Sequence, residues 1–202
     1  EGAARNEIYN AKNASLTAIN PKTGEILAMI GSKDYFGDPE PLGCEPGKSC
    51  QFEPNVNIAT RLRQPGSSFK PFVYATAIDK GFTPSTVIWD IPTEFNSLCS
   101  WNSIAEPGVN PETCYNPKNY DGKFRGPVTL KQALANSLNV PSVKILYLAG
   151  INDSIDNAEN MGISTLKDRS RYGLSLVLGS AEVKLLEMVS AYGVFATDGV
   201  RK

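Results

Sequence analysis

The architecture is organised around the segment Arg63-Gln64-Pro65-Gly66-Ser67-Ser68-Phe69-Lys70-Pro71-Phe72-Val73-Tyr74. The chain breaks at Pro65-Gly66 and then shows a helical pattern, with the Ser67 hydroxyl three positions before the Lys70 amine. Positions three apart lie on the same face of a helix. A serine becomes a nucleophile when a base takes its proton, and a desolvated lysine can be that base because burial favours its neutral form. The spacing alone favours a structural interpretation, in which Ser67 caps the helix and Lys70 is a surface lysine. Other parts of the sequence are needed to distinguish this interpretation from a catalytic pair.

The composition excludes several kinds of site. Lys and Arg total 20 against 21 for Asp and Glu, a net charge of -1 that gives no electrostatic argument for nucleic acid. The chain contains no histidine, which removes Ser-His-Asp catalysis, Cys-His catalysis and every histidine-based metal site. We therefore expect no metal, no cofactor and no nucleic-acid partner, and we expect lysine to be the base of any catalytic serine.

Four cysteines, Cys44, Cys50, Cys99 and Cys114, lie in stretches rich in Gly, Pro, Asn and Ser. No C-x-x-C pair is present, which argues against a zinc or thioredoxin-like site. Four cysteines allow three pairings, and we prefer the two local ones, Cys44 with Cys50 and Cys99 with Cys114. These disulfides would place the chain outside the reducing cytosol. Four free loop thiols are the alternative.

Two apolar runs near the N-terminus, 15–19 and 25–30, flank Asn20-Pro21-Lys22-Thr23-Gly24, and this arrangement predicts a β-hairpin. Both runs are apolar at nearly every residue, so we expect a sheet that is covered on both faces. The polar residues 1–14 before the hairpin are expected to form a leader or a short helix.

Helical patterns follow the hairpin. Pro71 is tolerated only in a first helical turn, Thr129 with Gln132 forms a capping box, and Ser180 is the expected N-cap of the last helix. The expected helices cover approximately 67–80, 129–135, 141–149, 153–161 and 180–196, separated by the Pro- and Gly-rich loops 33–57 and 82–126. One hairpin and a run of helices predict an α+β fold in a single domain, since 202 residues suffice for one substantial core.

Enzymes that use a Ser-x-x-Lys nucleophile also carry a Ser-x-Asn element and a Lys-Thr-Gly element. Ser137-Leu138-Asn139 matches the second, at the joint between two predicted helices. Three further matches have plainer interpretations. Ser164-Thr165-Leu166-Lys167 precedes a charged turn, Ser100-Trp101-Asn102 lies between Cys99 and Cys114, and Lys22-Thr23-Gly24 occupies the hairpin tip, where glycine serves the turn.

Longer stretches decide between the interpretations of Ser67 and Lys70. The segment 63–71 closely resembles the nucleophile motif of class A (bifunctional) penicillin-binding proteins. The stretch from Asn119-Tyr120-Asp121-Gly122 through Gly126-Pro127-Val128-Thr129-Leu130 to Ala135-Asn136-Ser137-Leu138-Asn139-Val140-Pro141 is similar to the same family's Ser-x-Asn region. Residues 20–29 resemble the hairpin that opens its transpeptidase domain, and residues 187–196 resemble a later helix. The resemblance implies the serine β-lactamase and penicillin-binding-protein transpeptidase fold.

The resemblance also implies roles. Ser67 would attack the D-Ala-D-Ala bond of a peptidoglycan stem peptide and form an acyl-enzyme, and its backbone N–H would be one oxyanion donor. Lys70 would take the serine proton, Ser137 would relay it to the leaving amine, and Asn139 would bind the substrate's amide backbone. An amine of a second stem peptide would complete the cross-link. β-Lactams would stop the cycle at the acyl stage.

The family's catalytic Lys-Thr-Gly strand follows the region matched here, so we expect residues 1–202 to be the N-terminal portion of a transpeptidase domain. We expect its site to be incomplete and its activity alone to be weak or absent. The resemblance implies an upstream glycosyltransferase domain and a membrane anchor outside this chain, on the extracytoplasmic face of the bacterial cytoplasmic membrane. Three alternatives stay open: a β-lactamase or D,D-carboxypeptidase on the same scaffold, a penicillin-recognising sensor, and a non-catalytic module.

Overall fold

A computed structural model describes residues 11–202. The leader or short helix predicted for residues 1–14 lies largely outside the described residues, and residues 11–14 have no regular secondary structure. The chain forms two compact units. The hairpin unit contains residues 11–63 together with 159–167 and 182–202, and the helical unit contains 64–158 and 168–181. The structure is α+β, as the sequence predicted, and the single domain stays a prediction.

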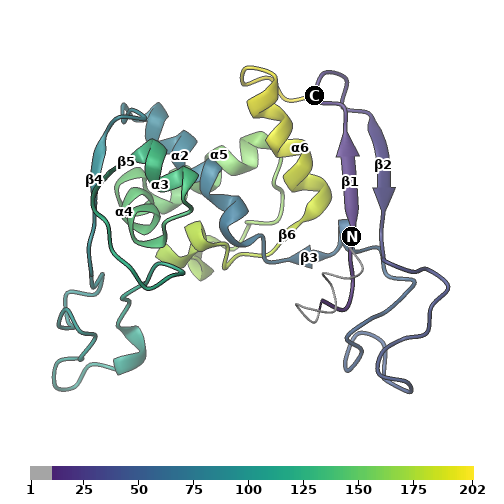
Figure 1. Ribbon diagram of the computed structural model, residues 1–202, viewed down its shortest axis with the longest axis horizontal. Coiled ribbons are helices and arrows are strands. Elements are labelled where there is room, and N and C mark those ends of the chain that lie inside the picture. Colours follow the sequence, from purple (N-terminus) through teal and green to yellow (C-terminus); the bar gives the residue numbers. More distant parts are fainter. Residues whose placement is uncertain (1–10) are drawn as a thin grey trace. The chain divides into compact units, whose positions relative to one another are not determined.

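The hairpin unit is built on an antiparallel pair, β1 (Leu16–Ile19) and β2 (Ile26–Ile30). α6 (Leu185–Ala196) packs against β1, as Figure 1 shows. The expectation of a sheet covered on both faces was wrong, because β2 is mostly exposed and Leu27 keeps 66% of its surface. Ile26, Leu27 and Ala28 are all exposed, and since consecutive residues of a strand point to opposite faces, neither face of β2 is well covered by the described residues.

The hairpin unit also contains η1 (Ile58–Thr60) and a short antiparallel pair, β3 (Leu62–Arg63) with β6 (Val183–Lys184). β6 leads directly into α6. The predicted start of this helix at Ser180 was therefore wrong. Residues 183–184 are extended because they pair with β3, and Lys184 is the N-cap.

The helical unit packs α2 (Lys70–Asp79) against α4 (Asn139–Ala149), as Figure 1 shows. The Tyr74 hydroxyl on α2 lies 3.0 Å from the Ser142 hydroxyl on α4. The unit's other elements are β4 (Val87–Asp90), β5 (Gly126–Thr129), α3 (Leu130–Ala135), the first part of α5 (Ile151–Met161), η2 (Gly66–Phe69), η3 (Pro111–Thr113), η4 (Arg169–Arg171) and η5 (Leu174–Leu178). The large side chains of its core are fully buried: Phe69, Phe72, Val73, Leu130, Ile145, Leu146, Ile155 and Leu176.

Local signals predicted these helices well. Thr129 and Gln132 form the expected reciprocal capping box, and Pro71 lies in the first turn of α2. The antiparallel pair of β4 and β5 was missed within a region taken as loop. Its signal is weak, because only Ile88 and Asp90 of β4 are buried, and one of them is charged.

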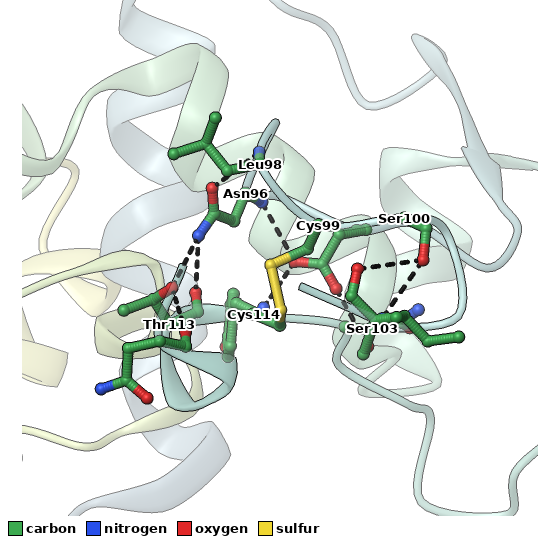
Figure 2. Close-up of a disulfide and its surroundings, with 12 residues drawn as sticks. Asn96, Leu98, Cys99, Ser100, Ser103, Thr113 and Cys114 are labelled. Carbon is green, nitrogen blue, oxygen red and sulfur yellow. Dashed lines mark hydrogen bonds between the residues drawn. A yellow bond between two sulfur atoms is a disulfide. The ribbon is translucent and has the colours of Figure 1, made fainter. Parts of the chain in front are cut away.

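Each of the two long loops, 33–57 and 82–126, contains one disulfide. Cys44 is joined to Cys50 and Cys99 to Cys114, the pairing preferred from the sequence, and the described residues contain no free cysteine. Figure 2 shows that Asn96 reinforces the second loop, because its side-chain amide donates to the Thr113 carbonyl at 3.1 Å. Among residues 11–202, no helix is both long enough and apolar enough to cross a bilayer.

The two disulfides are expected to contribute unequally to stability. They join residues 15 and 6 positions apart, and the chain-entropy model gives about 3 kcal/mol and about 2 kcal/mol for such loops. Replacing Cys99 and Cys114 together by Ser should therefore lower the free energy of unfolding more than replacing Cys44 and Cys50. Denaturant unfolding of the two double variants measures the difference, and a larger loss from the shorter loop would contradict it.

Candidate active site

Ser67 lies in a 3-10 turn, η2, that leads directly into α2. The buried Phe69 and Phe72 fix this junction, with their ring centroids 5.5 Å apart, and the Ser67 side chain is left exposed. Backbone N–H groups in a first turn have no partner inside the helix. The junction therefore presents both the Ser67 hydroxyl and its N–H.

A close backbone contact also supports the η2 turn that carries Ser67. η5 packs on η2, and its C-cap Gly179 lies against Gly66. A Cβ added at Gly179 would lie 2.2 Å from the Gly66 nitrogen, and the φ of +80° also favours glycine. Gly179 thus helps to hold the residue before Ser67. No local pattern in the sequence points to this role of Gly179, because the contact joins segments more than 100 residues apart.

Lys70 is buried among three acceptors. Only 1% of its surface is exposed, and its Nζ donates to the Ser137 carbonyl at 2.7 Å, to Ser137 Oγ at 3.1 Å and to Asn139 Oδ1 at 2.9 Å. An ammonium has three donors, so all three are used. Burial lowers the pKa of Lys70 to about 8, because desolvation penalises the charged form. The Lys70 amine can therefore lose its proton close to neutral pH and act as a base.

Ser137 occupies a position that usually belongs to glycine. It follows the end of α3 with a φ of +51°, and its N–H bonds the Leu134 carbonyl while the Leu138 N–H bonds the Ala133 carbonyl. These two bonds form a Schellman motif, whose left-handed residue is most often Gly. The left-handed region costs an L-residue roughly 1–2 kcal/mol. The strained conformation directs both the carbonyl and the hydroxyl of Ser137 to Lys70.

Asn139 is the first residue of α4, and both ends of its amide are bound. Its Oδ1 accepts from Lys70, and its Nδ2 donates to the Lys118 carbonyl at 2.9 Å. The structure thus brings together Lys70 of α2, Ser137 of the joint between α3 and α4, and Asn139 of α4. The Ser67 hydroxyl has no hydrogen bond within residues 11–202, and all three Lys70 donors are engaged elsewhere.

The other motif matches have structural roles. The Ser164 hydroxyl and N–H both bond the Glu187 carboxylate at 2.8 Å. The Ser100 hydroxyl bonds Asn102 inside the disulfide loop, and residues 22–24 form the β1–β2 turn. In the described part of the chain, no group of three or more Cys, Asp or Glu side chains could hold a metal ion.

An α+β fold with a Ser-x-x-Lys helix start and a facing Ser-x-Asn joint defines the penicillin-recognising class of proteins. The family model described as the penicillin-binding protein transpeptidase domain matches residues 14–202, and the chain belongs to this family.

Curated relatives include two penicillin-binding proteins 1A. The protein of Rickettsia bellii is 32% identical over 189 residues, which cover 94% of this chain and 20% of that protein. The protein of Neisseria meningitidis is 35% identical over 188 residues, covering 93% and 20%. The chain thus spans about one fifth of the length of the curated relatives it matches.

Solved structures show the same fold. Penicillin-binding protein 1A of Haemophilus influenzae superposes with a TM-score of 0.68 at 32% identity, over 92% of this chain and 23% of that one. PonA1 of Mycobacterium tuberculosis superposes with a TM-score of 0.67 at 20% identity, over 99% and 47%. The fold class, predicted from the resemblance, is confirmed.

The left-handed conformation of Ser137 can be tested by stability alone. Ser137→Gly and Ser137→Ala both remove the hydroxyl that bonds Lys70. Only Gly relieves the backbone strain, so Ser137→Gly should be more stable than Ser137→Ala by about 1 kcal/mol. Denaturant unfolding of the two variants gives this difference directly. The usual order, with Ala more stable than Gly, would contradict the Schellman geometry.

Proposed function

We propose that this chain carries the acylation half of a peptidoglycan D,D-transpeptidase, in which Ser67 forms the acyl-enzyme. The observation that supports the proposal best is the buried Lys70, whose pKa is lowered to about 8 and whose amine bonds both Ser137 and Asn139. Catalytic bases work best with a pKa near the operating pH. A lysine with only a structural role at the surface would keep its usual pKa and its contact with water.

Acylation begins when Lys70 loses a proton and gains a lone pair. The amine then keeps two donors and can accept the proton of Ser67 Oγ, which attacks the carbonyl carbon of the D-Ala-D-Ala bond. Ser137 Oγ, 3.1 Å from Lys70 Nζ, passes its proton to the departing amine of D-Ala and receives in exchange the proton that Lys70 took from Ser67, which leaves Lys70 neutral again. The C–N bond breaks, D-Ala leaves, and the stem peptide remains as an ester of Ser67.

Deacylation runs the same steps in reverse with a different amine. An amine of a second stem peptide attacks the ester carbonyl and loses a proton through Ser137 to Lys70. A new peptide bond forms, the ester C–O bond breaks, and Ser67 Oγ regains its proton from Lys70. The Ser67 N–H supports the oxyanion in both halves, since N–H groups in the first turn point toward developing negative charge. Asn139 binds the amide backbone of the donor peptide. A β-lactam follows the first half and stays bound as the acyl-enzyme.

The full protein acts on the extracytoplasmic face of the bacterial cytoplasmic membrane. Two disulfides support this location, because disulfides persist outside the reducing cytosol. Peptidoglycan stem peptides and β-lactams are its proposed ligands. Four points stay predictions: the upstream glycosyltransferase domain, the membrane anchor, the weak activity of residues 1–202 alone, and the completion of the site by a Lys-Thr-Gly strand.

A covalent adduct tests the nucleophile. Incubating the full-length protein with a fluorescent penicillin should add the mass of one opened penicillin, and Ser67→Ala should abolish the label. Ser164→Ala is the matched control, because Ser164 belongs to the second Ser-x-x-Lys and bonds Glu187. Labelling that persists in Ser67→Ala would refute the proposal. Rapid release of the label by water would favour a β-lactamase or carboxypeptidase, and acylation without peptide cross-linking would favour a sensor.

The acylation rate should rise with pH through about 8. Below this value Lys70 keeps its proton and cannot accept that of Ser67, and above it the neutral amine predominates. Lys70→Arg should abolish acylation at every pH, because arginine stays protonated. Stopped-flow measurement of penicillin acylation from about pH 6 to about pH 10, on either side of this pKa, gives the profile. A rate that is flat across pH 8, or that persists in Lys70→Arg, would show that another group is the base.

A further inference from the structure

α4 begins without a capping side chain of its own. The N-cap is Leu138, which has no side-chain acceptor, so the first backbone N–H groups of the helix need partners from elsewhere. Asn119 supplies them, because its Oδ1 accepts from the Asn139 N–H at 2.8 Å and from the Val140 N–H at 3.3 Å. The start of α4, which carries Asn139 of the site, is therefore held by a residue 20 positions earlier.

The Asn119 amide has only one orientation. Its Nδ2 donates to both carboxylate oxygens of Asp90, at 2.8 and 2.9 Å, and to the Lys123 carbonyl at 2.8 Å. Together with the two bonds to its Oδ1, these contacts use the full capacity of a primary amide. A flipped amide would place its NH2 against two N–H groups and its oxygen against a carboxylate. With only 5% of its surface exposed, Asn119 also has little access to water that could compensate.

Asp90 anchors this amide from the end of β4, and its side chain is fully buried. One oxygen also accepts from the Arg125 N–H at 3.0 Å, and the Arg125 guanidinium lies 4.0 Å away. On α4, Lys144 Nζ donates to the carbonyl of Trp89 at 2.7 Å. The strand that carries this buried carboxylate is therefore itself hydrogen-bonded to α4.

We propose that Asp90 and Asn119 are positioning residues for the Ser-x-Asn element, a role that rests on the proposed function. Neither reaches Lys70. Asn119 holds the backbone of Asn139, while the adjacent Lys118 carbonyl holds the Asn139 side chain. This double attachment points Asn139 Oδ1 at Lys70, and Asp90 acts by fixing the orientation of the Asn119 amide.

The geometry makes acylation sensitive to this pair. Asn139 Oδ1 is one of three acceptors of the Lys70 ammonium within residues 11–202, and the other two belong to Ser137, two residues before it. A shift at the start of α4 would move all three. Misplacement of catalytic groups by about 1 Å can cost on the order of 100-fold in rate. It would also change the environment that sets the proton affinity of Lys70.

An exchange of the two side chains tests the orientation directly. Asn119→Asp alone places two carboxylates together in a buried site and should reduce acylation most, and Asp90→Asn alone should reduce it less. The double variant Asp90→Asn with Asn119→Asp restores one amide donor facing one carboxylate, and the carboxylate introduced at position 119 can still accept from both α4 N–H groups. It leaves the Lys123 carbonyl without its donor, so the recovery is expected to be partial. We expect it to recover acylation to within about 10-fold of the unmodified protein, well above Asn119→Asp.

The loss of the remote cap is tested by Asn119→Leu, which has a similar size and no acceptor. In the full-length protein we expect penicillin acylation to fall about 10- to 100-fold and the midpoint of its pH profile to shift. Asn96→Ala is the matched control, since the half-buried Asn96 also accepts from a backbone N–H, that of Leu98, and donates to the Thr113 carbonyl beside the Cys99–Cys114 disulfide. It should lower the melting temperature and leave the rate and the midpoint of the folded protein unchanged.

The outcomes separate this inference from the proposed function. If the unmodified protein is not acylated at Ser67, the proposed function fails. If it is acylated, but Asn119→Leu behaves like Asn96→Ala with an unchanged pH midpoint, then Asn119 is structural only and the positioning role is refuted. If the exchange variant is no more active than Asn119→Asp although it is folded by circular dichroism, the orienting role of Asp90 is refuted.

Discussion

The site depends on the burial of one ammonium group. Lys70 lies at the start of α2 with almost no exposed surface, and the dipoles of Ser137 and Asn139 balance its charge. Burial lowers its pKa because desolvation penalises the charged form, whereas a close negative charge would favour that form. The packing of α2 against α4 brings the lysine and its acceptors together.

The acceptors of Lys70 are held by backbone conformations that the residue types at these positions do not favour. Ser137 accepts a left-handed conformation at the end of α3, where glycine would be less strained. α4 begins at a leucine cap and takes its acceptor from Asn119. Both departures lie beside Lys70, in keeping with the tendency of strained or locally unfavourable conformations to persist at functional sites.

Signals confined to a few neighbouring residues predicted their elements well. The capping box of Thr129, the position of Pro71 and the glycines after the helices act over one helical turn, so no tertiary contact was needed to place α2 and α3. Elements that depend on a distant partner were misjudged. Residues 183–184 became a strand because they pair with β3, and the strand 87–90 formed because it pairs with β5. β2 stayed exposed because the described residues cover it only partly.

The sequence by itself determined the chemistry that is available: a serine and a lysine one turn apart, a Ser-x-Asn joint, and no histidine to compete as a base. The tertiary structure decided which of the repeated motifs form a site. Ser67 and Ser164 have the same spacing to a lysine, yet only Lys70 is buried against a Ser-x-Asn joint, while Ser164 bonds Glu187. The physical reason is that desolvation and hydrogen bonding depend on which side chains surround an amine in space, and spacing along the chain does not specify them.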